Sequence, residues 1–289
     1  MPTIADLPIG AKLKFGAYSV ADEAPHKICW IKVHNDGTLL SEFMEDQLAF
    51  DAREPGNPNT HRRTYGNNRY SQSNIHQFLN AESFDWFQNK NQFDEAPVDD
   101  GIINHRFGYV NKPGFLHYFD SWEIEAIEAS EVKTAIPNVD TQADGDTYET
   151  MYSKVFLPSI ANVGAGYTKE GEKWEYFQEK NPACTFSPEL FEFTPNPDKP
   201  DYDDEDWYYY LRSANTGSAY YVRCINSGGG NSTAYAADDY LGIRPALKLN
   251  LDAVVSDDPD VDGYYEVLNV PQEIIEIDEE EFFAILKTK

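Results

Sequence analysis

Apolar and polar residues alternate along the N-terminal part of the chain in the manner of paired β-strands. The alternation surrounds Leu13 and Phe15 and returns in residues 28–33, and a period of two predicts strands with one buried face. Asn35-Asp36-Gly37 follows, and the Asp-Gly pair tolerates the positive φ angles of a hairpin turn. Residues 38–40 resume the strand pattern, so we expect a sheet to begin here.

Two short helices are predicted further along the chain. Ser73 is a suitable N-cap for a helix over residues 73–80, whose apolar residues share one face. Asp120 and Glu123 have the spacing of a capping box, which predicts a second helix that begins near Asp120. The polar stretch 51–65 between the first strands and the first helix is predicted to be a loop.

The fold class follows from how these elements succeed one another. Residues 155–159 contain an apolar run that ends at a proline, which predicts a buried strand. Short helices and many short strands occur without regular strand–helix alternation, and this order argues against a parallel sheet. We therefore expect an α+β fold with short helices and a mostly antiparallel, irregular sheet.

The segment 207–249 combines two kinds of sequence. Its ends, residues 209–211 and 243–249, carry the aromatic, branched and aliphatic residues of buried strands. Its middle is rich in Tyr, Asn, Ser and Gly, which give antibody recognition surfaces wide contact area and adaptable hydrogen bonds. A binding surface and a plain Gly/Asn-rich hairpin loop both fit this composition. The candidate ligand-binding residues are Asn215, Tyr220, Tyr221, Asn226, Asn231, Tyr235, Asp239 and Tyr240.

Charge narrows the range of partners. The 289 residues include 23 basic and 50 acidic side chains, a formal net charge of −27, and so acidic a surface repels phosphate backbones and anionic lipids. We therefore expect neither nucleic-acid binding nor membrane insertion. The sequence shows no apolar run that could span a bilayer and no signal-peptide pattern. We expect a protein that is made in the cytosol and leaves it only by lysis or inside an assembly.

Little in the sequence predicts catalysis. Cys29, Cys184 and Cys224 lie far apart without metal-type spacing, which predicts reduced, buried thiols. Nucleophile elbows, phosphate loops, zinc-protease motifs and paired-carboxylate motifs are absent from the sequence, and we expect no enzymatic activity.

Calcium is the only cofactor that the sequence suggests. Asp258, Asp260 and Asp262 alternate just before Gly263, as carboxylates do in calcium loops. Position twelve of such a loop is Asn269 rather than a bidentate Glu. A solvated acidic turn without a metal is therefore the alternative.

The C-terminal residues 253–289 lie beyond the main pattern, and we expect a single domain over residues 1–252. Residues 256–263 predict an acidic turn, residues 273–277 a strand, and Asp278 begins a short helix. This strand and helix are too apolar for a free tail. They either fold back on the domain or dock on a neighbouring subunit of a homo-oligomer, and we expect docking.

Several segments follow one another in an order that is characteristic of a known family. They lie in residues 65–80, 94–97, 112–116, 154–159 and 170–177, and they end with Tyr210-Leu211-Arg212-Ser213 and Gly242-Ile243-Arg244-Pro245-Ala246-Leu247. This order resembles a domain family of unknown function, widespread in Firmicutes and gut phages, that ends in W-L-R-S … G-V-R-P-A-L.

The last third of that family is similar to C-type-lectin-like domains of the formylglycine-generating-enzyme type. Such domains also serve as variable proteins of diversity-generating retroelements and as phage receptor-binding proteins. The resemblance implies that Arg212 and Arg244 belong to a fixed frame and residues 215–240 to the displayed surface. Because a guanidinium fork donates several hydrogen bonds, we expect both arginines to be structural. Formylglycine generation needs a reactive cysteine pair, whereas only Cys224 lies in the comparable region.

The function implied by the resemblance is attachment to a host. We expect a bacteriophage virion protein, a component of a tail or head fibre, that is assembled in the host cytoplasm. Its lectin-like surface would bind a host cell-surface protein or glycan, and other virion subunits would be its second class of partner. The alternative is a capsid or tail decoration protein that uses the same fold for protein–protein contacts alone.

Overall fold

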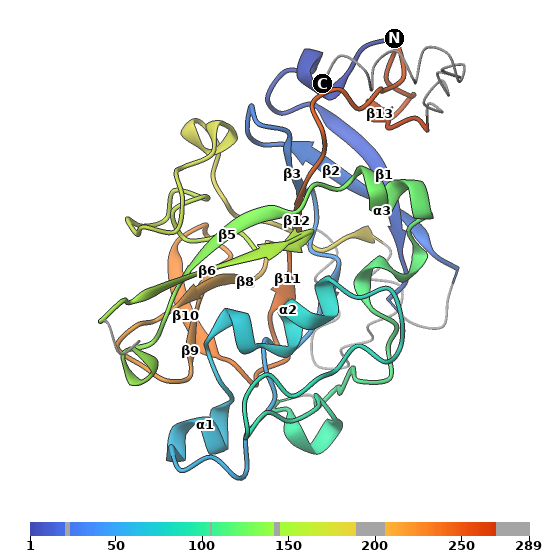
Figure 1. Cartoon of the computed structure of the whole chain (residues 1–289). Coiled ribbons are helices and arrows are strands. Elements are labelled where there is room, and N and C mark those ends of the chain that lie inside the picture. The colour runs from blue at the N-terminus through green and yellow to red at the C-terminus, as the bar shows by residue number, and fades with distance from the viewer. Residues whose placement is uncertain (21–23, 105, 142–144, 189–205, 270–289) are drawn as a thin grey trace, which may run out of the picture.

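The computed structural model describes residues 1–20, 24–104, 106–141, 145–188 and 206–269. Short strands form a six-stranded, a five-stranded and a two-stranded sheet, and short helices lie around them (Figure 1). Most neighbouring strands are antiparallel, whereas β1 pairs with β13 and β8 pairs with β11 in parallel. The predicted α+β class with a mostly antiparallel, irregular sheet is therefore confirmed.

The six-stranded sheet contains the predicted N-terminal strands. β1 and β2 are antiparallel, with Leu13 opposite Trp30, and β3 follows through the predicted turn, where Gly37 has a φ of 91°. A Cβ atom at Gly37 would lie 2.3 Å from the carbonyl oxygen of Leu249, so both the backbone angle and the space require glycine. The strands, in sheet order, are β13 (Tyr264–Glu266), β1 (Lys12–Tyr18), β2 (His26–Lys32), β3 (Thr38–Ser41), β12 (Ala246–Lys248) and β7 (Val155–Phe156).

The five-stranded sheet contains the Tyr- and Asn-rich segment. Its β8 is buried along its whole length, which confirms that residues 209–211 are core. Its β10 is an edge strand with partly exposed side chains. The strands, in sheet order, are β10 (Asn231–Tyr235), β9 (Tyr221–Ile225), β8 (Tyr209–Ala214), β11 (Gly242–Ile243) and β4 (Asp46–Gln47), and the two-stranded sheet consists of β5 (Ser130–Ala135) and β6 (Tyr148–Ser153).

Both predicted helices are present. In α2 (Asn74–Leu79) the Ser73 hydroxyl accepts the His76 amide hydrogen, and α3 (Ser121–Ala126) begins with the capping box of Asp120 and Glu123. Six 3₁₀ helices complete the set within the described residues: η1 (Ile4–Asp6), η2 (Tyr70–Gln72), η3 (Asp99–Gly101), η4 (Phe115–Tyr118), η5 (Asn138–Asp140) and η6 (Glu175–Gln178).

The prediction of a loop throughout residues 51–65 is wrong. Its last part is α1 (Thr60–Tyr65), whose N-cap Asn59 accepts the amide hydrogens of His61 and Arg62. Arg62 is buried in this helix. Because the buried residue is charged, the sequence of α1 lacks the apolar residues at helical spacing that would predict a buried face. The helix therefore depends on tertiary contacts rather than on its own hydrophobic pattern.

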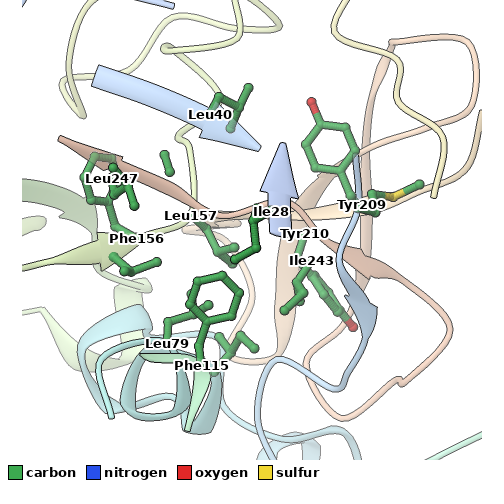
Figure 2. Packing of buried hydrophobic residues seen from close by; sticks show 14 of the residues in the cluster. Ile28, Leu40, Leu79, Phe115, Phe156, Leu157, Tyr209, Tyr210, Ile243 and Leu247 are labelled. Atoms are coloured by element: carbon green, nitrogen blue, oxygen red, sulfur yellow. The ribbon is translucent and has the colours of Figure 1, made fainter. Parts of the chain in front are cut away.

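One continuous hydrophobic core joins the two large sheets to the helices. Tyr209 and Tyr210 of β8 project to opposite sides of their strand, and Leu79 of α2 lies beside Phe115 of η4 (Figure 2). Trp30, Tyr209 and Tyr210 have no exposed surface. Because β8 contributes to the packing on both of its faces, the strand that precedes the Tyr- and Asn-rich residues is fixed in place.

The C-terminal boundary differs from the expectation. β13 pairs with β1, and Val255 and Val267 are 0% and 8% exposed. The six-stranded sheet therefore extends past residue 252 into the residues expected to form the tail, near the N-terminal end of the chain (Figure 1). The predicted strand 273–277 and the helix from Asp278 lie outside the described residues.

A candidate recognition surface of stacked aromatic rings

The centre of the candidate site is the β9–β10 hairpin. Tyr221 of β9 lies directly opposite Tyr235 of β10 in the antiparallel register, and their rings stack with centroids 5.2 Å apart. Tyr220 precedes β9 and its ring centroid is 4.4 Å from that of Tyr221. All three rings are partly exposed. The register thus collects three of the predicted ligand-binding tyrosines on one surface.

Helix α1 adds two rings that the sequence did not single out. Tyr65 stacks on Tyr235 at 4.3 Å and on Tyr220 at 5.1 Å. The exposed His61 stacks on Tyr220 at 4.8 Å. We call His61, Tyr65, Tyr220, Tyr221 and Tyr235 the aromatic surface. Stacked rings at these separations attract one another beyond the area they bury, so the surface has a defined shape.

Asn68 fixes the turn between β8 and β9. It is completely buried, and its Nδ2 donates to the carbonyl oxygens of Ser218 at 2.9 Å, Tyr221 at 2.8 Å and Asn215 at 3.4 Å. One side chain thus holds both ends of the turn that carries Tyr220. No periodic pattern marks such a residue, because its partners lie about 150 positions away in the sequence.

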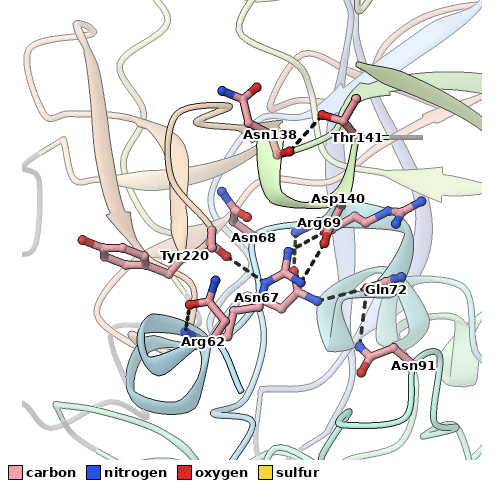
Figure 3. A network of polar contacts seen from close by, with 12 residues as sticks. Arg62, Asn67, Asn68, Arg69, Gln72, Asn91, Asn138, Asp140, Thr141 and Tyr220 are labelled. Carbon is pink, nitrogen blue, oxygen red and sulfur yellow. Dashed lines mark hydrogen bonds and ion pairs between the residues drawn. The ribbon is translucent and has the colours of Figure 1, made fainter. Parts of the chain in front are cut away.

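Arg62 holds the same turn from helix α1. Its Nε donates to the carbonyl oxygen of Ala219 at 3.2 Å, and its guanidinium makes a bidentate ion pair with Asp140. Figure 3 shows Arg62 and Asn68 side by side in this polar network, with Tyr220 at its edge. A buried guanidinium with its donors used is a rigid support, so α1 and the turn are held together beneath the aromatic surface.

Tyr210 anchors the far end of the hairpin. Its hydroxyl donates towards the carbonyl oxygens of Tyr235 at 2.6 Å and Asp238 at 2.7 Å. Burial raises the pKa of the Tyr210 phenol well above its ordinary value, because the charged form has no water around it. The hydroxyl therefore stays protonated and available as a donor.

The two frame arginines are buried and hydrogen-bonded, as a structural role requires. Arg212 donates to the carbonyl oxygens of Lys133, Leu157 and Glu170 at 2.6–3.1 Å and to Asn162 Oδ1. Arg244 donates to the carbonyl oxygen of Ser41 at 2.9 Å and, over longer distances, to those of Glu42 and Pro182. Each guanidinium therefore fastens loops to the sheets.

Five predicted ligand-binding residues lie elsewhere in the hairpin region. The Asn226 Oδ1 accepts the amide hydrogens of Gly228 and Gly230 and so closes the β9–β10 turn. Asp239 is buried and accepts the amide hydrogen of Phe107. These two act within the fold. Asn231 is exposed on β10, Asn215 is part of the β8–β9 turn, and Tyr240 packs against Trp207 rather than in the aromatic surface.

The predicted calcium loop does not gather its carboxylates. Asp260 Oδ2 pairs with Lys14 Nζ at 2.5 Å, and its Oδ1 accepts the amide hydrogens of Asp262 and Tyr264. This pairing lowers the pKa of Asp260 to about 2. Among the described residues, Asp258, Asp260 and Asp262 form no group of converging ligand atoms. The geometry favours the alternative, an acidic turn closed by Asp260.

The cysteines are free thiols, as the sequence predicted. Cys184 and Cys224 are buried and Cys29 is partly buried. Burial raises the pKa of Cys29 and Cys184 to about 11 and that of Cys224 to about 12. At neutral pH all three are protonated, and the thiol form is a poor nucleophile.

Among the hollows lined by described residues, two have volumes of about 390 Å³ each. One is lined by Trp174 and Arg212 among others, and the second by Cys29 and Tyr264 among others. Residues of the aromatic surface line neither of them. The aromatic surface is therefore separate from both.

Comparison with known families identifies the domain. Residues 35–251 match the family described as a domain of unknown function, DUF6273. The chain belongs to this family. No curated protein and no solved structure matches the chain. The DUF6273 match includes the whole aromatic surface and both frame arginines, while β1, β2 and β13 extend the six-stranded sheet beyond it. None of the helices that the structure describes is long and apolar enough to cross a membrane.

Proposed function

We propose that this DUF6273 domain is a recognition protein with a lectin-like role, displayed on a phage virion, whose aromatic surface binds a host cell-surface glycan or protein. The observation that carries the proposal is the cluster of partly exposed stacked rings, whose main chain is held by buried polar residues such as Asn68. A few residues provide most of the binding energy in many interfaces, and Tyr and Trp are common among them. The virion setting comes from the sequence resemblance to phage receptor-binding proteins.

The buried polar residues beneath the aromatic surface make it suitable for binding. Asn68, Arg62 and Tyr210 fix the main chain that carries Tyr220 and Tyr235. A surface that is ordered before binding loses little conformational entropy when a ligand arrives. Several copies on one particle would raise weak single contacts to firm attachment, because later contacts form at high effective concentration.

The proposal is tested by removing two rings of the aromatic surface that take no part in the buried hydrogen bonds beneath it. Tyr220→Ala with Tyr235→Ala is expected to weaken binding of the purified protein to host cells by about 100-fold or more, since a central aromatic contributes about 2 kcal/mol. Binding isotherms on intact cells and on glycan arrays measure the loss. The matched control is Tyr167→Ala, which removes a fully exposed ring elsewhere. A double variant that keeps its melting temperature and binds host cells like the unaltered protein contradicts the proposal.

A second function, decoration of a capsid or tail by protein–protein contacts alone, is favoured by the edge strand β10. Unpaired main-chain groups on an edge strand accept a strand from another chain, and β10 carries Tyr235 of the aromatic surface. Hydrogen exchange in assembled particles separates the two functions. Protection of residues 231–235 in the particle supports decoration, whereas exposure of these residues supports recognition.

A further inference from the structure

Three buried carboxylates from two separate segments meet beneath the aromatic surface. Asp51 and Glu54 follow β4, and Asp94 lies in the loop before η3. Their side chains belong to residues that are 1%, 0% and 3% exposed. One oxygen of each lies within 4.8 Å of those of the other two. We call this group the carboxylate cluster.

Within the described part of the chain, no basic side chain forms an ion pair with the carboxylate cluster. Among the residues that the structure describes, no Lys or Arg nitrogen lies within 4.0 Å of these three groups. The adjacent Lys90 is exposed, and its Nζ is directed to Gln88 Oε1 at 3.5 Å. Buried charges are normally paired or bound to a metal. The cluster therefore requires a cation or protons.

The hydrogen bonds around the cluster suit ionised carboxylates. Both oxygens of Asp51 accept main-chain amide hydrogens, from Asn67 and Asn74 at 3.0 Å each. The two oxygens of Glu54 accept side-chain amide hydrogens, including those of Asn57 and Asn91. Donors that face a carboxylate on two sides favour its charged form.

Asp94 contributes a buried carboxylate oxygen whose hydrogen-bonding capacity is unused. Its Oδ2 accepts the main-chain amide hydrogen of Lys90 at 2.8 Å, whereas its Oδ1 is buried without a hydrogen-bond partner. A buried carboxylate oxygen without a donor is costly. Because this residue belongs to a convergent group of three carboxylates, a bound cation is the natural partner for the free oxygen.

We propose that Asp51, Glu54 and Asp94 bind one divalent cation, Ca²⁺ in preference to Mg²⁺. Carboxylate oxygens are hard ligands that suit both ions. Ca²⁺ accepts an irregular arrangement of protein oxygens, whereas Mg²⁺ demands near-octahedral geometry and retains several waters. A buried site formed by three carboxylates from two loops fits Ca²⁺ better.

The position of the site gives the cation a structural role. The Asp51 amide donates to the carbonyl oxygen of Ala236 at 2.9 Å, and the Ala236 amide donates to that of Tyr220 at 3.0 Å. Asn67, which donates to Asp51, immediately precedes Asn68 and its three bonds to the β8–β9 turn. A bound ion thus holds in place the main chain that supports the aromatic surface. The effect of the ion on ligand binding rests on the proposed function, whereas ion binding itself does not.

The alternative to a metal is a proton. Burial raises the pKa of Asp94 to about 6, and burial together with the neighbouring Asp94 and Glu54 raises that of Asp51. Without a cation, one proton shared between two of these carboxyl groups would relieve the repulsion among them. The two states respond differently to added Ca²⁺.

The experiment uses the full chain, stripped with EDTA and dialysed, and needs no host ligand, so it can fail independently of the proposed function. Calorimetric titration with CaCl₂ at pH 8 is expected to show one saturable site, with weaker binding of MgCl₂. Melting temperature is expected to rise by about 5 °C or more at 100-fold excess over the dissociation constant. Absence of both heat and thermal shift with CaCl₂, MgCl₂ and MnCl₂ overturns the proposal in favour of the shared proton.

Asp94→Asn tests the assignment to these residues. The substitution preserves the shape of the side chain and removes one ligand charge. It is expected to weaken Ca²⁺ binding more than about tenfold. In EDTA, the melting temperature of the variant is expected to equal or exceed that of the unaltered protein. The matched control Asp262→Asn, in the exposed acidic turn, is expected to retain the whole Ca²⁺ response. An Asp94→Asn variant that binds Ca²⁺ normally overturns the assignment.

If this variant does not fold, Tb³⁺ luminescence of the unaltered protein decides. Displacement of Tb³⁺ by one equivalent of Ca²⁺ supports a single site, and absence of luminescence contradicts it.

Discussion

Arg212 and Arg244 have the same side chain and similar burial, but the structure gives them unequal importance. The four hydrogen bonds of Arg212 are 2.6–3.1 Å long. Two of the three bonds of Arg244 are 3.4 and 3.5 Å long. Short charge-assisted bonds to buried carbonyls contribute more than long ones, so the stability of the frame depends more on Arg212.

Arg212→Lys is expected to lower the free energy of unfolding by about 3 kcal/mol, and Arg244→Lys by about 1 kcal/mol. Lysine keeps the charge but lacks the planar fork, so it leaves buried carbonyl oxygens without donors. Urea denaturation followed by fluorescence measures both values. Equal losses would contradict the ranking, and unchanged stability with lost ligand binding would assign the arginines to the ligand site.

At the scale of elements, the β8–β9 turn and the β9–β10 turn use asparagine in opposite ways. Asn68 acts as a donor to three carbonyl oxygens. Asn226 acts as an acceptor from two main-chain amides. Aspartate preserves the acceptor role and abolishes the donor role, so the same substitution distinguishes the two turns.

Asn68→Asp is expected to destabilise the protein by about 2–4 kcal/mol, because a buried carboxylate would face carbonyl oxygens without a proton to share. Amide hydrogen exchange is expected to accelerate in residues 215–221 but not in β5. Asn226→Asp is the matched control and is expected to change stability by less than about 0.5 kcal/mol. Unchanged exchange in residues 215–221 of the Asn68 variant would show that Asn68 does not hold the turn.

At the scale of the whole molecule, the domain is larger than its family match. The six-stranded sheet takes β1 and β2 from before the matched residues 35–251 and β13 from after them. Lys14 of β1 pairs with Asp260 across 246 positions of sequence. The two flanking segments therefore belong to the same folding unit.

A chain that ends at residue 269 is expected to unfold cooperatively, whereas one that ends at residue 252 is expected to be less stable by about 3–5 kcal/mol. The shorter chain loses two buried valines and exposes the edge of β1, which also promotes aggregation. Thermal melts and size-exclusion chromatography compare the two. Identical melts and monodisperse elution of both chains would restore the boundary at residue 252.

The sequence alone determined the features that depend on neighbours along the chain. The β1–β2–β3 meander follows from period-two alternation and the Asp36-Gly37 turn, and α2 and α3 follow from their caps. Family membership also followed from local motifs. In each case the deciding interactions join residues a few positions apart, so a linear pattern records them.

Tertiary structure alone decided which residues meet. It placed Tyr65 and His61 against Tyr220 and Tyr235, moved Tyr240 away from them, and gathered the carboxylate cluster in place of the carboxylates of the acidic turn. It also formed α1 around a buried arginine. These arrangements depend on hydrogen bonds and packing between residues far apart in sequence, whose spacing no local period encodes. For this protein, local patterns fixed the N-terminal strands and helices α2 and α3, whereas long-range contacts fixed α1, the aromatic surface and the site beneath it.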